Sequence, residues 1–355
     1  MALTLTSLTQ IAALGFDAVI DVRSPSEFAE DHLPGAINLP VLDDEERARI
    51  GTIYKQQSPF LARKLGAALV ARNAAKHLEG PLSDKSGGWR PLVYCWRGGQ
   101  RSGSFASILA QVGWRVELVE GGYKAWRKLI VSQNEDTPVA AQVVVLDGNT
   151  GSAKTEVLAL LVARGLQVID LEGLANHRGS LFGAMPGGQP SQKAFEGRVA
   201  VALASLDPQR PVIVEAESSR VGNLVLPKQL WSAMGDAPRI RIAAPLEARA
   251  AYLARAYGDV AQDLDRLSRV IDRLRPLHAA GVVDDWLEMA GAGKFAPLAQ
   301  DLMLRHYDPR YEKHRAKFDT QNEVVIAVDA LTPEALETVA DRVADAVEGL
   351  VSTAN

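Results

Sequence analysis

The feature that most constrains the fold is a buried-strand pattern that runs into a glycine-containing loop and then into a helix. Residues 142–146 form the strand pattern, and residues 147–155 form the loop, which contains Gly148 and Gly151. Apolar residues then recur at helical spacing at Val157, Leu158, Leu160 and Leu161. A strand, a short glycine loop and a helix in this order open a βαβ unit. This half of the chain is therefore expected to build a parallel sheet.

Further short strand patterns alternate with helical stretches along the same half. They lie at residues 168–169, 212–214, 240–243 and 324–328. The alternation predicts an α/β domain with a mostly parallel sheet and helices on both faces. Such sheets bind their ligands beyond the carboxyl ends of the strands, so the loops at those ends are the candidate sites.

The loop after the first of these strands has the context of a phosphate-binding P-loop. Its backbone amides and the helix N-terminus are suited to holding phosphate oxygens. We expect Lys154 to reach the terminal phosphates and Thr155 to be able to ligate Mg²⁺. The predicted phosphate-binding residues are Gly148, Asn149, Thr150, Gly151, Ser152, Ala153, Lys154 and Thr155.

One position departs from the usual P-loop pattern. Glycine normally precedes the lysine, and Ala153 stands there in this chain. A Cβ at this point is expected to crowd the backbone or the ligand. Phosphate binding is the prediction, Ala153 argues against ATP turnover, and a loop that holds no ligand is the alternative.

The single cysteine of the chain, Cys95, excludes an internal disulfide and a multi-cysteine zinc site. It follows a predicted strand at residues 91–94 and opens a glycine-rich loop that leads into a helix. The inward amides of such a loop form an anion nest, and the helix dipole adds positive potential. We therefore expect a nucleophilic thiolate, with a bound anion held by Arg97, Gly98, Gly99 and Arg101.

The N-terminal half resembles the rhodanese family over roughly residues 5–130. The resemblance rests on the segments 21–23, 32–38, 95–101 and 121–126. It implies a rhodanese-like α/β domain in which Cys95 carries sulfur or selenium. Five residues separate Cys95 from Arg101, a spacing that also resembles tyrosine-type phosphatases and arsenate reductases and suits a larger tetrahedral anion.

Two alternatives to a sulfur or selenium carrier remain for this half. A phosphatase is disfavoured because Tyr94 replaces the usual histidine before the cysteine and no general acid is identified. The other alternative is an inactive binding module. Asp21 and Arg23 are expected to brace the loop as a strand-end pair, and His32 is expected to be a turn residue.

A length of 355 residues fits two domains. The polar segment 132–140 precedes a new strand, so we predict a rhodanese-like domain at 1–132, a linker at 133–140 and a P-loop domain at 141–355. The last domain is expected to include a helical lid or RNA-binding region. Neither a run of 18 apolar residues nor a signal-peptide pattern occurs, so a cytoplasmic protein without membrane contact is expected.

The net charge of −4 means that any RNA contact needs a local basic face. The candidates are the arginines in 239–275 and the basic residues in 305–317, which are interleaved with tyrosines. A solvated helix face or a lid would show the same pattern of residues. Further candidates for ligand or RNA contacts are His177, Arg178, Glu215, Glu217 and Arg220. Either glutamate could instead cap the next helix.

Four segments of the chain resemble the tRNA 2-selenouridine synthase family, namely 170–183, 215–222, 94–99 and 307–311. The resemblance covers nearly the whole chain. It implies an enzyme that geranylates wobble 2-thiouridine of tRNA with geranyl diphosphate and then exchanges the sulfur for selenium from selenophosphate. It also implies an enzyme that supplies selenophosphate as a partner. A sulfurtransferase fused to a small-molecule kinase, or a regulatory protein with two relic sites, are the competing hypotheses.

Overall fold

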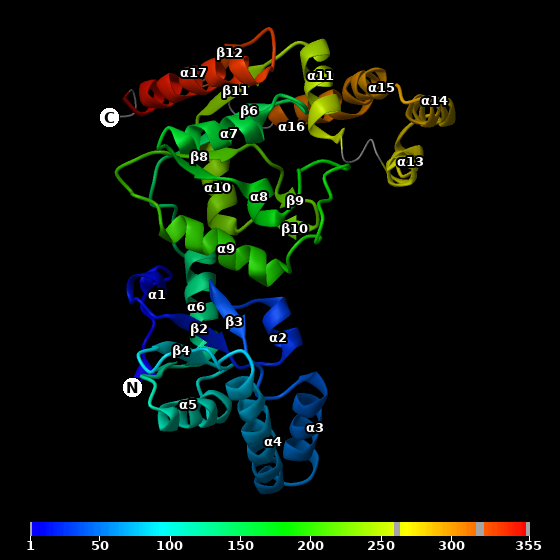
Figure 1. The fold of residues 1–355 in the computed structure, drawn as a ribbon. Coiled ribbons are helices and arrows are strands. Elements are labelled where there is room, and N and C mark those ends of the chain that lie inside the picture. The colour runs from blue at the N-terminus through cyan, green and yellow to red at the C-terminus, as the bar shows by residue number, and fades with distance from the viewer. Residues whose placement is uncertain (1, 259–262, 317–322, 353–355) are drawn as a thin grey trace. The chain divides into compact units, whose positions relative to one another are not determined.

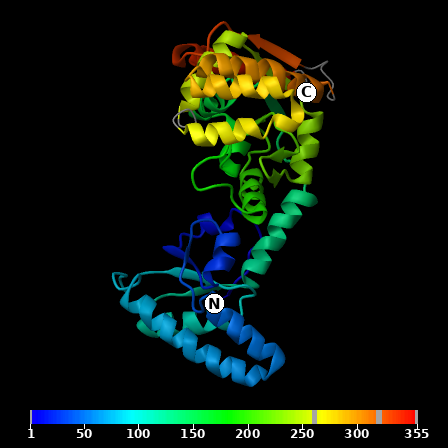
Figure 2. The ribbon, with the colours of Figure 1, turned by 90° about the vertical axis from the view of Figure 1, so that its right-hand side faces the viewer.

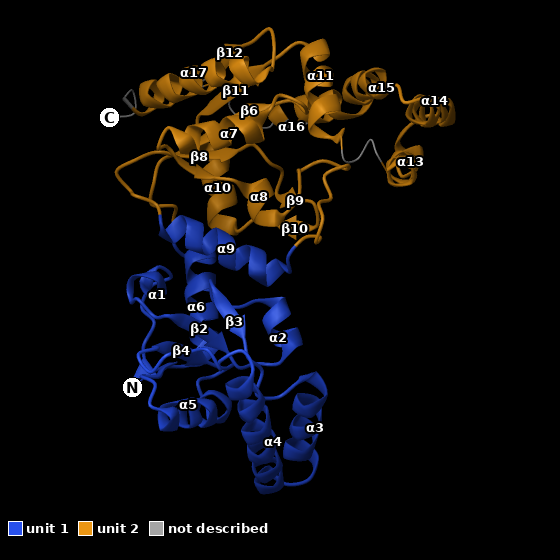
Figure 3. Cartoon of the chain, viewed as in Figure 1, with its two compact units in different colours: residues 1–137, 190–205 blue, residues 138–189, 206–355 orange. Residues whose placement is uncertain are grey.

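The computed structural model describes residues 2–258, 263–316 and 323–352, and the chain divides into two compact units (Figure 3). Unit 1 comprises residues 1–137 and 190–205, and unit 2 comprises residues 138–189 and 206–355. Each unit contains a five-stranded sheet whose paired strands run parallel. The predicted α/β fold class is therefore confirmed for both halves.

The sheet of unit 1 has the strand order β1-β5-β4-β2-β3. Its strands are β1 (Ala2–Leu3), β2 (Ala18–Asp21), β3 (Ala36–Asn38), β4 (Pro91–Tyr94) and β5 (Glu117–Val119). Every residue of β4 is buried, as expected for a central strand of a parallel sheet covered on both faces. Asp21 is paired in register with Tyr94, so β2 and β4 end at the same edge and deliver Arg23 and Cys95 there.

Several helices of unit 1 begin at a serine or aspartate cap. They are α1 (Gln10–Ala13), α2 (Pro25–Glu30), α3 (Asp44–Gln56), α4 (Pro59–Glu79), α5 (Gln100–Val112), α6 (Gly122–Glu135) and α9 (Gln192–Ala204). Ser24 and Glu27 form a capping box at the start of α2, which satisfies backbone donors that the helix itself leaves free. The helices α3 and α4 lie side by side as a hairpin in both views (Figures 1 and 2).

The division of the chain differs from the sequential one expected from the sequence. Helix α6 continues to Glu135, inside the segment predicted as a linker. Helix α9 groups with unit 1 because it packs on α6, where the Asn134 amide donates to the carbonyl of Glu196 (3.0 Å). Ala200 and Ile130 belong to one apolar cluster. A boundary placed by linker composition cannot reveal a helix that returns to an earlier domain.

The sheet of unit 2 has the order β12-β11-β6-β8-β7. Its strands are β6 (Val143–Gly148), β7 (Gln167–Ile169), β8 (Val212–Glu215), β11 (Arg239–Ala243) and β12 (Glu323–Ala327). A separate antiparallel pair joins β9 (Arg220–Val221) and β10 (Leu224–Val225). All five strands predicted from the sequence are present, with ends shifted by one or two residues.

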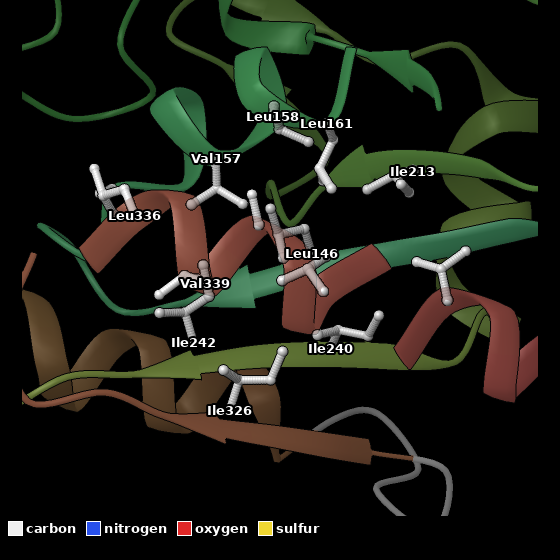
Figure 4. Close-up of a cluster of buried hydrophobic side chains, with 14 of the residues drawn as sticks. Leu146, Val157, Leu158, Leu161, Ile213, Ile240, Ile242, Ile326, Leu336 and Val339 are labelled. Atoms are coloured by element: carbon white, nitrogen blue, oxygen red, sulfur yellow. The ribbon is translucent and has the colours of Figure 1, made fainter. Parts of the chain in front are cut away.

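Helices cover this sheet and close its core. They are α7 (Lys154–Ala163), α8 (Leu171–Ala175), α10 (Lys228–Asp236), α11 (Leu246–Ala256) and α17 (Pro333–Ser352). Figure 4 shows Leu146 and Ile242 of the sheet meeting Val157 of α7 and Val339 of α17. These side chains are almost completely removed from water, and their burial fixes α7 and the loop before it against the sheet.

A helical segment follows α11 and has an apolar cluster of its own around Trp286. It contains α13 (Leu264–Asp272), a 3₁₀ turn (Arg275–Leu277), α14 (Ala280–Gly291), α15 (Phe295–Leu302), a π-helical stretch (Met303–Tyr307) and α16 (Asp308–Arg315). The π-helical stretch widens the helix between α15 and α16, a feature frequent at functional sites. In the part of the chain that the structure describes, no helix is both long and apolar enough to cross a membrane.

Candidate functional site

The Cys95 loop holds the cysteine sulfur among hydrogen-bond donors. The backbone amide of Gly99 (3.3 Å) and the hydroxyl of Ser102 (3.2 Å) both donate to Sγ, and Cys95 is 4% exposed. The next turn of chain packs tightly against the loop at Gly122, which has φ +58° and whose Cβ, if present, would collide with the carbonyl of Cys95. The loop is therefore shaped by local donors and by a close backbone approach.

The surroundings of Cys95 favour the thiolate. Burial raises the pKa of the thiol, but the Ser102 hydroxyl and the backbone amides of Ser102, Arg97 and Gly99 stabilise the anion by more. The resulting pKa of Cys95 lies below its ordinary value. The thiol of Cys95 is therefore biased toward its anionic form, and its role as a nucleophile stays a prediction from the sequence.

A pocket beside Cys95 is lined by Trp96, Arg97, Gly99, Gln100 and Arg101 and by Glu27 and Arg47. Glu27 pairs with Arg101 (NH1 to Oε2, 2.7 Å) and with Arg47 (Nε to Oε2, 2.8 Å). Burial raises the pKa of Glu27, and the Arg101 guanidinium outweighs it, so this pKa is lowered. Arg97 is exposed and faces the pocket without a salt bridge to another described residue.

Asp21 and Arg23 form the strand-end pair that the sequence predicted, and the Arg23 guanidinium lies 5.9 Å from the ring centroid of Trp96 in the Cys95 loop. Arg23 is 1% exposed, and its NH2 lies 2.6 Å from Oδ2 of Asp21 and 2.6 Å from the carbonyl of Asp31. Tyr94 is completely buried and its hydroxyl accepts the amide of Leu33 (3.1 Å). The tyrosine that replaces the phosphatase histidine therefore has a packing role.

In unit 2, the P-loop adopts a strained backbone at the position where glycine is usual. Ala153 has φ +60° and ψ +27°, a left-handed conformation that costs an L-residue about 1–2 kcal/mol. Its Cβ is buried in the apolar cluster with Val157 and Tyr252. The crowding expected from the sequence thus appears as backbone strain, and the loop still leads directly into α7.

Lys154 spans the loop from the first turn of α7. Its Nζ donates to the carbonyl of Gly148 (2.9 Å) and lies 5.7 Å from the ring centroid of Tyr311. Burial opposes its charge, but Tyr311 and the carboxylate of Glu172 raise the pKa of Lys154 above its ordinary value. The lysine therefore stays cationic. Thr155 donates its hydroxyl to Glu172 (3.2 Å).

Asp308, at the start of α16, holds the P-loop from a distant part of the sequence. It accepts from Asn149 Nδ2 (3.0 Å) and forms a two-pronged pair with Arg249 (2.9 and 2.8 Å). Arg249 also donates to the carbonyl of Thr150 (3.2 Å), and Arg315 NH2 donates to Asn149 Oδ1 (2.8 Å). We call Asp308, Arg249 and Arg315 the loop brace.

An apolar cavity opens beside the same loop. Its lining includes Thr150 of the loop and side chains of α11, α15 and the π-helical stretch, among them Leu253, Leu298, Ala299, Leu302 and Met303. Tyr257, Phe182 and Tyr307 complete its walls. The cavity is therefore a mostly apolar space that adjoins the P-loop.

Three glutamates gather at the carboxyl ends of the strands in unit 2. Glu215 is completely buried; its Oε1 accepts the amide of Glu172 (2.6 Å), and its Oε2 has no hydrogen-bond partner among the described residues. Gly179 has φ +62°, and a Cβ there would collide with both Glu172 and Glu217. Burial, together with the nearby charge of Glu172, raises the pKa of Glu215 and of Glu217 well above the usual value.

Burial and mutual repulsion therefore make these carboxyls bind a proton more readily than exposed carboxyls do. Over the described ranges, no group of three or more His, Cys, Asp or Glu side chains has the arrangement to hold a metal ion by itself. Mg²⁺ commonly shares its ligands between protein oxygens and substrate phosphates. Oxygens of Thr155, Glu172 and Glu217 are of the right chemical type for such a shared site.

The other residues predicted to contact a ligand or RNA are His177, Arg178 and Arg220, and each lies in a different environment. His177 has a pKa lowered by burial, and its Nδ1 is buried without a hydrogen-bond partner among the described residues. The guanidinium of Arg178 lies 4.8 Å from the ring centroid of Tyr257, which lines the apolar cavity. Arg220 is exposed on β9, and its side chain makes no hydrogen bond to the three glutamates in the described structure.

The predicted RNA face in the C-terminal arginines needs correction. Arg239 and Arg249 are 5% and 6% exposed, and Arg315 is paired with Asp147 and Asn149. An RNA-binding role for these three arginines is wrong, because each guanidinium is buried or paired with a carboxylate of the protein itself. Arg269 and Arg273 remain exposed. Lys317 lies outside the described residues, as does the side chain of His314.

Sequence reasoning missed several groups at these sites. Ser102 directly follows Arg101, and a hydroxyl at that place was a usable signal. Asp308 lies in a segment noted only for its resemblance to a family. Glu27, Glu172 and Arg249 gave no local signal, since each reaches its site only through tertiary packing.

Comparison with known proteins identifies the family. The model described as the tRNA 2-selenouridine synthase AAA domain matches residues 141–273, and the rhodanese-like domain model matches residues 5–129. A tRNA 2-selenouridine synthase of Nitrosomonas europaea is 33% identical over 86% of this chain and 83% of its own length. Those of Alcanivorax borkumensis and Shewanella frigidimarina are 41% and 38% identical, and the matches span 64% and 65% of their lengths. The chain belongs to the tRNA 2-selenouridine synthase family.

Proposed function

We propose that this protein replaces the sulfur of wobble 2-thiouridine in tRNA with selenium from selenophosphate, through a geranylated intermediate. The observation that carries the proposal is the apolar cavity that adjoins the P-loop in a chain that also carries an activated Cys95. The relatives named tRNA 2-selenouridine synthase favour this function over a sulfurtransferase fused to a small-molecule kinase.

In the first step, the P-loop holds the diphosphate of geranyl diphosphate and the apolar cavity takes its hydrocarbon chain. The sulfur of 2-thiouridine attacks C1 of the geranyl group, so an S–C bond forms as the C1–O bond breaks. Diphosphate leaves, and Lys154 offsets the charge that develops on it. The N3 proton of the nucleoside is lost, and the raised pKa of Glu217 fits a carboxyl that accepts it.

A bound Mg²⁺ would neutralise further charge on the leaving diphosphate, with Thr155 and Glu172 as the protein ligands. The steps proposed here consume no ATP. Alkylation matters because it converts the sulfur into a neutral thiol leaving group for the second step.

In the second step, selenium must reach C2 at the oxidation level of selenide. Transfer of selenium to Cys95 as a perselenide would need an oxidant, because selenium in selenophosphate is already fully reduced. A balanced route is attack of the Cys95 thiolate on phosphorus, which forms an S–P bond and releases hydrogen selenide. The selenide then attacks C2 and expels geranylthiol, and water hydrolyses the phosphocysteine.

Arg97 and the donors of the Cys95 loop would hold the phosphoryl group, and Ser102 would stabilise the thiolate when water releases it. An enzyme that makes selenophosphate is the implied partner. We expect the reaction in the cytoplasm, where tRNA is available.

The cavity assignment is tested by Ala299→Phe, which fills the cavity from α15. We expect the Kd for geranyl diphosphate to rise at least about tenfold while the Kd for inorganic diphosphate stays unchanged, because the P-loop is untouched. The control is Ala296→Phe, an exposed position on the same helix that does not line the cavity. Equal losses for both ligands would contradict the assignment.

The competing hypothesis makes a different prediction. A kinase fusion hydrolyses ATP when a small acceptor is added and leaves the nucleosides of tRNA unchanged. Mass spectrometry of digested tRNA after incubation with both substrates, beside an ATP hydrolysis assay, separates the two.

A further inference from the structure

The α3–α4 hairpin of unit 1 has a charge that the rest of the chain does not share. The hairpin, residues 44–79, contains seven lysines and arginines and four acids, three of which lie in the first turn of α3, whereas the whole chain carries −4. All seven cations are exposed; they are Arg47, Arg49, Lys55, Arg63, Lys64, Arg72 and Lys76. A concentrated positive surface on an acidic protein marks a place where a polyanion would be attracted.

Most of this charge is not neutralised within the protein. Arg47 is paired with Glu27, and Lys76 donates to Asn73. The other five cations form no salt bridge to any residue in the described ranges. Unpaired cations on a helix surface keep their potential for a partner, and their side chains are already in water.

A groove on α3 leads from this surface to the Cys95 pocket. Arg47, Gly51, Tyr54 and Lys55 lie one or two helical turns apart and line the groove, together with Arg101. Arg47 and Arg101 also line the pocket that contains Cys95. The groove and the pocket therefore form one continuous surface within unit 1.

Aromatic rings accompany the cations. Tyr54 is 55% exposed and Phe60, at the start of α4, is 70% exposed. Trp96 lies half-buried beside Cys95 in the pocket. Cations that contact phosphates, interleaved with exposed rings on which unpaired bases stack, are the means by which proteins hold single-stranded RNA.

We propose that the α3–α4 hairpin is the surface that binds the single-stranded loop of the substrate tRNA and directs its modified base into the Cys95 pocket. Lys55 and Lys64 contact phosphates, and Tyr54 stacks on a base close to the pocket. An acidic protein is the other class of partner that a basic surface could fit, but the exposed rings and the path to Cys95 favour RNA. This inference rests on the proposed function.

The test uses the full chain and a labelled tRNA that contains 2-thiouridine, with Kd measured over a series of salt concentrations. For Lys55→Gln/Lys64→Gln we expect at least about fivefold weaker binding and a salt slope reduced by about 1.5, as two phosphate contacts are lost. For Tyr54→Ala we expect about tenfold weaker binding with an unchanged slope, because stacking carries no charge.

The matched control is Arg115→Gln/Lys128→Gln, which removes two exposed cations of unit 1 outside the hairpin. It should leave Kd within about twofold of the parent protein. Thermal unfolding and the alkylation rate of Cys95 serve as checks that the hairpin variants keep their fold and their reactive loop.

The outcomes separate this inference from the proposed function. Tight binding by the parent protein with equal Kd values for hairpin and control variants overturns the hairpin assignment and leaves the proposed function intact. Loss of binding to a selenophosphate-supplying enzyme with tRNA affinity retained overturns it in favour of a protein-docking surface. No tRNA binding by the parent protein overturns both.

Discussion

At the scale of single residues, Cys95 shows how two opposing effects set a reactivity. Removal from water would keep the sulfur protonated, and three backbone amides with one hydroxyl reverse that preference. Two of the arginines around the pocket, Arg47 and Arg101, are held in place by Glu27. The chemistry at this site depends on short-range donors as much as on charge.

Ser102→Ala is predicted to raise the pKa of the Cys95 thiol, because it removes the side-chain donor to Sγ. The alkylation rate by iodoacetamide at pH 7 should fall about three- to tenfold, which corresponds to at most about one pKa unit. The pH dependence of alkylation measures the shift. Ser107→Ala on the same helix removes only a bond to the carbonyl of Gly103 and should change nothing.

The residues that could be predicted from the sequence are those whose neighbours in space are also neighbours in the chain. Cys95, Arg97 and Lys154 belong to continuous loops, so their surroundings could be inferred from local pattern. Asp308 and Glu172 meet the P-loop across more than 15 residues of chain, and no periodicity indicates such a contact. The same limit produced the incorrect assignment of Arg249 to an RNA face.

At the scale of elements, α16 and the π-helical stretch link the P-loop to the apolar cavity. Asp308 and Arg315 of α16 hold Asn149, while Met303 and Tyr307 just before them line the cavity. One short segment of chain therefore contributes side chains to both the P-loop and the cavity. The positions of strands and helices in both units could be predicted from buried patterns and caps in the sequence. The loop brace could not be predicted in this way.

Asp308→Asn is predicted to destabilise unit 2, because it leaves the nearly buried Arg249 without its carboxylate. Breaking a buried pair costs about 3–5 kcal/mol, and we expect the lower end because Asp308 retains partial exposure. Urea unfolding measures the change. Asp272→Asn removes one partner of an exposed pair with Arg275 and should cost less than about 1 kcal/mol.

His306 should make unit 2 sensitive to acid. Burial, with Arg310 and His278 beside it, lowers the pKa of His306 to about 4. In the unfolded chain a histidine titrates near pH ~6.5, so below that value the unfolded state binds a proton that the folded state does not. The stabilising contribution is complete above about pH 6.5 and is lost as the pH falls toward 4.

Melting temperatures of the parent protein and of His306→Gln, compared between pH 7.5 and 5, test this. The difference between the two proteins should shrink or reverse toward pH 5, since the variant lacks the titrating ring. A difference that stays constant with pH would rule out His306 as the source of acid sensitivity.

At the scale of the whole molecule, we propose that each of the two units carries out one step of the reaction. The chain passes between them three times, because α9 belongs to unit 1 although it follows the first strands of unit 2. The sequence predicted two α/β domains in the right order, since each has its own strand–loop–helix signature. It could not predict the return of α9, whose packing partner lies more than 50 residues earlier.

Our central proposal is that the P-loop unit alkylates the sulfur and that Cys95 releases selenide from selenophosphate for the second step. The most direct test is mass spectrometry of nucleosides from 2-thiouridine-containing tRNA after incubation with geranyl diphosphate, selenophosphate and Cys95→Ala. We predict that geranylthiouridine accumulates and selenouridine is missing, while the parent protein makes selenouridine and Lys154→Ala leaves 2-thiouridine unchanged. Loss of geranylation in Cys95→Ala, or selenouridine formed at the parent rate, would contradict the account.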